Sequence, residues 1–301
     1  NPRQQSLRIF WHGLQIRASK DHAGIFCFIS EQIIELMVYM VNKVNTMASN
    51  VLSKSQFDFF NKQGYLLVEN LLTQKEVKEY RNVYEDFLSN KIESARYRAD
   101  LAGQSEESAG KPEVEKITQI MIPSRLFPVL LHKPLHQRSL AFARQLLGKD
   151  LELDFDMLID KAPYTNAPTP WHQDAAYWIS MPDTRAVSCW VALDEAKKEN
   201  GCMWYIPKSH LLPVRPHVPS AKGGGALMCE ASEDEAVAME IQPGSCVFHH
   251  GGTLHYSRGN STGNRRRAFI TNFRPESMIR YEREHGFDHT GDRKVNNEEA
   301  K

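Results

Sequence analysis

Two residues of one short segment, His172 and Asp174, carry side chains that bind divalent transition metals. They stand two positions apart, and in an extended strand residues i and i+2 face the same side. An imidazole and a carboxylate on one side supply two of the three ligands of the set that binds Fe(II) and leaves other positions open. The pair alone is weak evidence, because His-x-Asp recurs by chance and more often serves a hydrogen bond or an exposed turn.

The best candidate for the third ligand is His255, which ends a β-like run that begins after Pro243 and Gly244. Arg266 opens the next β-like run, and a turn through residues 260–264 would return that strand beside the first. A guanidinium holds one carboxylate through two parallel hydrogen bonds, so Arg266 is a candidate anchor for a dicarboxylate. The run Arg265-Arg266-Arg267 could simply be exposed, as such basic runs more often are. In a strand, however, side chains alternate, so Arg266 would point to one face and its two neighbours to the opposite face.

The other histidines lack a partner carboxylate at ligand spacing. His249 and His250 are adjacent and point to opposite faces of a strand, so we expect both to be structural, with His250 the one able to support the pocket. Four more are expected on the surface or in loops: His132, His136, His210 and His217. Four aromatic residues are expected in the core, or else in the pocket wall: Trp171, Tyr177, Trp178 and Trp204.

The elements that must position these residues change character along the chain. Helices are predicted first, with capping signals at Ser53 and at Thr73 with Glu76, over residues 53–63, 73–88 and 134–147. β-like runs dominate afterwards, over residues 151–160, 186–193, 202–206, 237–241, 245–249 and 268–273, with earlier ones at 65–69 and 116–122. This order favours an α+β protein whose strands close into a sandwich or jelly roll.

Net charge and cysteine usage indicate which partners and which cellular compartment to expect. The 37 basic and 37 acidic side chains cancel, which disfavours a nucleic-acid substrate. Five cysteines without a CxxC pair indicate a reducing compartment, and we expect the cytoplasm. The alternative is the peroxisome, because an amino-terminal address is loosely matched at Arg8, Ile9, Gln15 and Ile16.

One domain with additions is the simplest organisation. Residues 1–52 read as an extension outside the globular domain, residues 53–285 as the domain, and residues 286–301 as a polar tail. The apolar stretch 25–41 is interrupted by Glu31 and Glu35, so no membrane span is expected there. Residues 102–112 read as a surface loop.

Four stretches together resemble the phytanoyl-CoA dioxygenase family. They are most similar to the branch of phytanoyl-CoA dioxygenase domain-containing proteins. They are WHQDAAYW at 171–178, WVALDEAKKENGCMWYIPKSH at 190–210, IQPGSCVFHHGGTLHYS at 241–257 and NRRRAF at 264–269. The resemblance spans residues 53–273 and implies a double-stranded β-helix, or cupin-like jelly roll, with flanking amino-terminal helices. It implies Fe(II) bound by His172, Asp174 and His255, with O2 and 2-oxoglutarate as cosubstrates. The 2-oxoglutarate contacts carried over from the family are Arg266, Ser257, Trp190, Gln173, Met157 and Lys116.

The same resemblance implies an oxygenase that hydroxylates an unactivated C–H bond of a small molecule or an acyl-CoA, releasing succinate and CO2. Related iron halogenases replace the carboxylate with a small residue, so Asp174 favours hydroxylation. A departure from the family is Lys208, where glycine is usual. Phosphates of an acyl-CoA would need a basic rim, for which the possible sources are Lys161, Arg185, Lys208, Arg215, Arg265 and Arg267.

Two alternatives stay open. A non-catalytic sensor module would keep the fold and bind 2-oxoglutarate and metal without turnover. A metal-dependent cupin-like enzyme would use the metal without 2-oxoglutarate, so that Arg266 would be dispensable for its activity.

Overall fold

The computed structural model describes residues 51–103, 115–220 and 226–289. Almost all of the predicted extension 1–52, including the apolar stretch 25–41 and the peroxisomal address, lies outside these ranges, as does most of the loop 102–112. Within the described ranges, no helix is long and apolar enough to cross a membrane.

The helices begin at the predicted caps. Ser53 caps α2 (Lys54–Gln63) and Thr73 caps α3 (Gln74–Leu88), each in a capping box with the residue three positions on. Gly64 ends α2 with φ of 83°, a left-handed conformation that suits glycine. The other α-helices of the described ranges are α4 (Pro123–Leu126), α5 (Pro134–Leu147) and α6 (Glu276–Glu284).

The strands form two antiparallel sheets, which confirms the α+β class and the double-stranded β-helix arrangement. The large sheet has the order β1-β11-β6-β13-β4-β3-β2. Its strands are β1 (Tyr65–Val68), β2 (Arg98–Asp100), β3 (Ile117–Met121), β4 (Leu151–Lys161), β6 (Val187–Ala192), β11 (Cys246–His250) and β13 (Arg266–Pro275). The small sheet has the order β10-β7-β12-β5, with β5 (Thr169–His172), β7 (Met203–Tyr205), β10 (Val237–Met239) and β12 (His255–Ser257). A separate pair joins β8 (Val218–Pro219) to β9 (Leu227–Met228).

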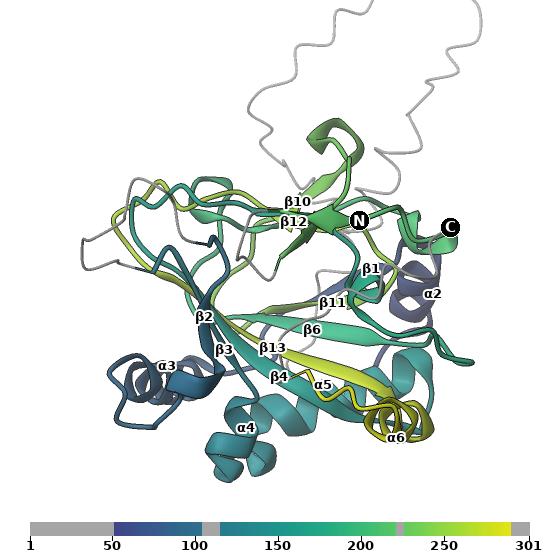
Figure 1. The fold of residues 1–301 in the computed structure, drawn as a ribbon, viewed down its shortest axis with the longest axis horizontal. Coiled ribbons are helices and arrows are strands. Elements are labelled where there is room, and N and C mark those ends of the chain that lie inside the picture. The colour runs from purple at the N-terminus through teal and green to yellow at the C-terminus, as the bar shows by residue number, and fades with distance from the viewer. Residues whose placement is uncertain (1–50, 104–114, 221–225, 290–301) are drawn as a thin grey trace, which may run out of the picture. The chain divides into compact units, whose positions relative to one another are not determined.

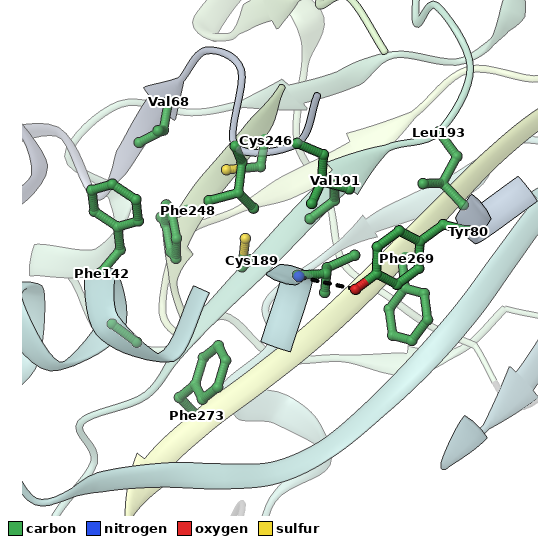
Figure 2. Packing of buried hydrophobic residues seen from close by; sticks show 14 of the residues in the cluster. Val68, Tyr80, Phe142, Cys189, Val191, Leu193, Cys246, Phe248, Phe269 and Phe273 are labelled. Carbon is green, nitrogen blue, oxygen red and sulfur yellow. Dashed lines mark hydrogen bonds between the residues drawn. The ribbon is translucent and has the colours of Figure 1, made fainter. Parts of the chain in front are cut away.

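The outer face of the large sheet packs against helices. Figure 1 shows α4 and α5 on one side of this sheet and β10 and β12 of the small sheet on the other. Side chains of α2, α3 and α5 bury the outer face in one apolar cluster, in which the rings of Phe142 and Phe248 lie side by side with centroids 5.8 Å apart (Figure 2). Within the helical layer, the Tyr80 hydroxyl of α3 accepts a hydrogen bond from the Leu135 backbone N–H of α5 at 2.9 Å.

Alternation along β6 separates the core from the cavity. Cys189 and Val191 belong to the outer cluster, whereas Ser188 and Trp190 line a cavity on the inner face. The large sheet is therefore buried on both faces, by helices outside and by the small sheet and the cavity inside.

The connection around His255 differs from the sequence prediction. The expected single run divides into β11 and β12, which belong to different sheets, with a turn between them in which the Thr253 N–H donates to His250 O at 2.8 Å. The strand that begins at Arg266 does not return beside His255, because β13 pairs with β4 and β6 of the large sheet. The chain therefore crosses from the large sheet to the small sheet between β11 and β12, and back to the large sheet between β12 and β13.

Candidate active site

The two candidate histidine ligands lie opposite each other on neighbouring strands. His172 ends β5, His255 begins β12, and the antiparallel register pairs them with ring centroids 4.2 Å apart. Each Nδ1 lies 2.8 Å from the backbone carbonyl oxygen two residues earlier, of Pro170 for His172 and of Thr253 for His255. A carbonyl oxygen only accepts, so Nδ1 carries the hydrogen and the Nε2 lone pair of each ring is free for a metal.

The carboxylate of Asp174 completes the group. Asp174 is the first residue of the 3-10 turn Asp174–Tyr177, which begins two residues after His172 at the end of β5. Its Oδ1 lies 3.8 Å from His172 Nε2 and 3.6 Å from His255 Nε2, and the ligand atoms of the three residues all lie within 4.8 Å of one another. Two imidazole nitrogens and one carboxylate oxygen around a single point suit Fe(II).

Electrostatics keeps these groups in the form that binds metal. Burial lowers the pKa of His172 and of His255, so both imidazoles are neutral at physiological pH. Burial also opposes ionisation of Asp174, but the neighbouring His255 and the hydrogen bond from His249 outweigh it and hold the pKa of Asp174 far below its usual value. Neutral imidazoles and an ionised carboxylate are the protonation states that metal binding requires.

Arg266 is a buried cation beside this group. It begins β13, is 1 % exposed, and its guanidinium lies over the Trp190 ring at 5.2 Å from the centroid. Its Nε and Nη1 have no hydrogen-bond partner among the described residues. Burial lowers the pKa of Arg266 to about 10, which still leaves it charged. A buried guanidinium with unpaired N–H groups fits an acidic ligand, because a carboxylate would satisfy them.

A single cavity of about 920 Å³ joins these groups. His172, Asp174 and His255 line it together with Arg266, from both sheets of the sandwich. Much of the remaining lining is apolar, including Leu101, Phe155, Ile159, Trp178, Ile179, Leu227, Ile270 and Phe287.

Comparison with known families matches residues 60–268 to the family described as phytanoyl-CoA dioxygenase (PhyH). The protein belongs to this family. It is therefore an oxygenase that depends on iron and 2-oxoglutarate, and the donor set and Arg266 described above fit both groups.

Known relatives of this oxygenase cover most of its chain. The probable phytanoyl-CoA dioxygenase of Caenorhabditis elegans is 27% identical over 252 residues, 78% of this chain and 80% of that protein. The human peroxisomal phytanoyl-CoA dioxygenase is 25% identical over 240 residues, 76% of this chain and 70% of that protein. The crystal structure of EvdO2 from Micromonospora carbonacea var. aurantiaca, complexed with 2-oxoglutarate, matches with a TM-score of 0.60 and 29% identity over 74% of this chain and 91% of that chain.

The predicted cosubstrate residues of the oxygenase do not all reach its cavity. Arg266, Ser257, Trp190 and Met157 line it. Lys116 lies just before β3 and does not line the cavity, whereas Gln119, within β3, does. The geometry therefore gives no support to Lys116 as a cosubstrate contact.

Gln173 is buried and also does not line the cavity. Its Nε2 donates to Gly252 O at 2.7 Å, and its Oε1 accepts from the Arg215 N–H at 2.8 Å. The period of two that turns His172 and Asp174 inward turns Gln173 outward. Its amide therefore ties the metal-binding segment to two backbone loops instead of facing 2-oxoglutarate.

Two predictions about histidines need correction. His249, not His250, faces the cavity, and its Nε2 lies 3.2 Å from Asp174 Oδ2. Periodicity could not decide between them because β11 is buried on both faces of the sheet. His136 is buried in α5, where its Nε2 lies 2.9 Å from Asp156 Oδ2, so it is not a surface or loop residue. His217 does lie in a loop, as predicted, and from there it lines the cavity and accepts a hydrogen bond from the Gln173 N–H at 3.1 Å.

A buried charged network that includes the cavity-lining His289 was not predicted. It joins β4, β13 and α6 through Asp154, Arg274, Glu282 and Arg283, with His289 bound to both Asp154 and Glu282. Residues 286–289, which were expected to belong to the polar tail, line the cavity. The sequence signal was weak, because the partners are far apart along the chain and His289 lies in a polar segment.

Proposed function

We propose that this oxygenase hydroxylates an unactivated C–H bond of a small molecule, with succinate and CO2 as coproducts. The observation that carries the proposal is the position of the His172, Asp174 and His255 group and of Arg266 in the wall of one mainly apolar cavity. Retention of Asp174 favours hydroxylation over halogenation, since no room is left for chloride in its place.

Each residue of the proposed site has a separate task. His172, Asp174 and His255 would hold the iron, which with 2-oxoglutarate supplies the activation of O2. Arg266 would bind the far carboxylate of 2-oxoglutarate through the N–H groups that lack partners. The face of Trp190 holds the guanidinium in place.

Ser257 and Met157 are proposed to complete the cosubstrate pocket. Ser257 is 1 % exposed and lines the cavity from β12, where its hydroxyl can donate to the same carboxylate. Met157 lines the cavity from β4, opposite Ile270 of β13 in the register. Its thioether supplies apolar surface along the cosubstrate and helps exclude water from the iron.

The cavity favours a small apolar molecule over an acyl-CoA. Of the six possible sources of a basic rim, Arg215 alone lines the cavity. Lys161 is buried and donates to Ala167 O at 2.8 Å. The other arginines are bound to acidic side chains: Arg185 to Asp150 and Asp183, Arg265 to Asp160, and Arg267 to Asp194 and Glu85.

Arg215 suits one acidic group on the substrate. Its Nη1 donates to Glu230 O, and no salt bridge to a carboxylate is found among the described residues. A substrate with an apolar body and one carboxylate or phosphate would place its acidic end at Arg215 and its carbon skeleton along the aliphatic and aromatic lining.

The test is a substrate panel of free acids, acyl-CoAs and small neutral metabolites, scored by succinate release above the uncoupled background. We expect stimulation by a small acid that requires Fe(II), 2-oxoglutarate and O2 and is lost in His172→Ala. His132→Ala removes an exposed histidine as a matched control and should retain activity. If the metal-loaded protein binds no 2-oxoglutarate, the proposal is wrong; stimulation by acyl-CoAs alone would overturn the substrate class.

A further inference from the structure

The two carboxylate oxygens of Asp174 have different surroundings. Oδ1 faces the Nε2 atoms of His172 and His255 at 3.8 and 3.6 Å. Oδ2 accepts a hydrogen bond from Ser188 Oγ at 2.7 Å and lies 3.2 Å from His249 Nε2. The protein therefore satisfies one oxygen itself and presents the other at the point where the two ligand imidazoles meet.

The groups that bind Oδ2 come from one row across the large sheet. His249 of β11 and Asn272 of β13 are both register partners of Ser188 on β6. Asn272 Nδ2 donates to Ser188 Oγ at 2.9 Å, which directs the Ser188 hydroxyl hydrogen toward Asp174. The row is rigid because each member lies on a central strand.

The orientation of His249 is fixed from its other side by Tyr205. The Tyr205 hydroxyl lies 3.3 Å from His249 Nδ1. Since a carboxylate oxygen accepts, Nε2 of His249 is the donor to Asp174, and Nδ1 faces the Tyr205 hydroxyl. The Tyr205 ring itself is held by stacking on Tyr65, with centroids 5.3 Å apart and planes 14° apart.

We propose that His249, Ser188 and Asn272, with Tyr205 behind His249, are positioning residues that hold Asp174 as a ligand through one oxygen. This inference rests on the proposed function, in which iron occupies the site. If Oδ2 were free, Asp174 could bind through both oxygens and take a position that the cosubstrate needs. The hydrogen bond to Asp174 also engages His249 Nε2, which keeps a third imidazole away from the metal although its ring centroid is 4.4 Å from that of His255.

The test compares the affinity for Co(II) of three variants with that of the wild type, by competition with a chelator. His249→Leu removes the donor to Oδ2 and should weaken Co(II) binding by roughly 10- to 100-fold, the usual effect of losing a partner of a metal ligand. His249→Gln places an amide N–H near the same oxygen and should recover most of the affinity. His250→Leu is the matched control: His250 lies on the same strand, does not line the cavity, and should leave the affinity unchanged.

A second measurement counts the imidazoles on the metal. Pulsed EPR of the vanadyl-substituted wild type should find two coordinated imidazoles. Three imidazoles in the wild type that fall to two in His249→Leu would make His249 a ligand and overturn the proposal, as would unchanged Co(II) affinity in a folded His249→Leu variant. If His249→Leu does not fold, His249→Gln decides through its Co(II) affinity and imidazole count.

A separate measurement tests the proposed function independently of the role of His249. Under anaerobic conditions, the wild type with Fe(II) should develop a visible charge-transfer band when 2-oxoglutarate is added. Absence of that band contradicts the proposed function, while the order of the Co(II) affinities still decides the role of His249.

Discussion

His255 lies directly opposite His172 in the antiparallel pair of β12 with β5. The register of these two short strands therefore sets the distance between the two imidazoles, and Asp174 needs only to follow β5 to reach the same point. The register shifts immediately after His255, so β12 is regular at the metal site and irregular beyond it. A slip of this pair by one residue would turn His255 away from the cavity and disperse the ligand set.

Replacement of Arg266 should separate cosubstrate binding from stability. We expect Arg266→Met to weaken 2-oxoglutarate binding by roughly 30-fold or more, since hydrogen bonds to a charged group contribute about 1.5–3 kcal/mol each. The unliganded protein should lose no stability, because methionine replaces a buried cation whose Nε and Nη1 lack partners. Anaerobic titration of the charge-transfer band and thermal unfolding measure the two effects.

Arg267→Met provides the matched control. Arg267 points away from the cavity and binds Asp194 and Glu85. Its loss should lower the unfolding temperature and leave the affinity for 2-oxoglutarate unchanged. The anchor assignment would be refuted by an Arg266→Met variant that binds 2-oxoglutarate as tightly as the wild type does.

Lys208→Gly should stabilise the protein. Lys208 has φ of 66°, a left-handed conformation that costs a residue with a Cβ about 1–2 kcal/mol and costs glycine little. Glycine also increases the freedom of the unfolded chain, which offsets part of the gain. We expect a net increase of up to about 1 kcal/mol in the free energy of unfolding, measured with urea.

Lys208→Ala separates backbone strain from the side chain. It removes the same charge and methylene groups but keeps the Cβ, so it should give no increase in stability. Equal stabilisation by alanine and glycine would show that the lysine side chain, and not the conformation of residue 208, is unfavourable.

Local signals predicted much of the fold. The capping boxes at Ser53 and Thr73 predict where α2 and α3 begin, because a cap depends only on residues within one turn of the helix. The alternation over residues 151–160, interrupted at Leu158, predicts β4. The candidate ligands His172, Asp174 and His255 were named because spacing and family motifs agreed.

The remaining features depend on contacts between distant segments. Sequence could not show that β11 and β12 belong to different sheets, since a short turn looks alike within a hairpin and between layers. The choice between His249 and His250 required the position of Asp174, which lies in another part of the chain. Likewise, the pairing of His289 with Asp154 joins two ends of the domain and leaves no local pattern.

His289 should make stability depend on pH. It contacts Asp154 and Glu282, with Arg274 and Arg283 bound to the same carboxylates. Burial disfavours its charged form, but the hydrogen bonds to Asp154 and Glu282 prevail and raise the pKa of His289 above the usual 6.5. A raised pKa means that the contribution to folding is complete below about pH 6.5 and is lost as pH rises through the folded-state value.

The measurement is the free energy of unfolding of the wild type and of His289→Gln at pH 6 and pH 9. Glutamine keeps one hydrogen bond but cannot carry the charge, so the variant should be less stable by about 1–3 kcal/mol at pH 6, with a smaller difference at pH 9. His285→Gln is the control, because His285 is exposed and its Nδ1 lies 2.8 Å from Tyr281 O, away from the carboxylates of Asp154 and Glu282. A difference between wild type and His289→Gln that stays constant or grows toward pH 9 would contradict a charged His289 in the folded protein.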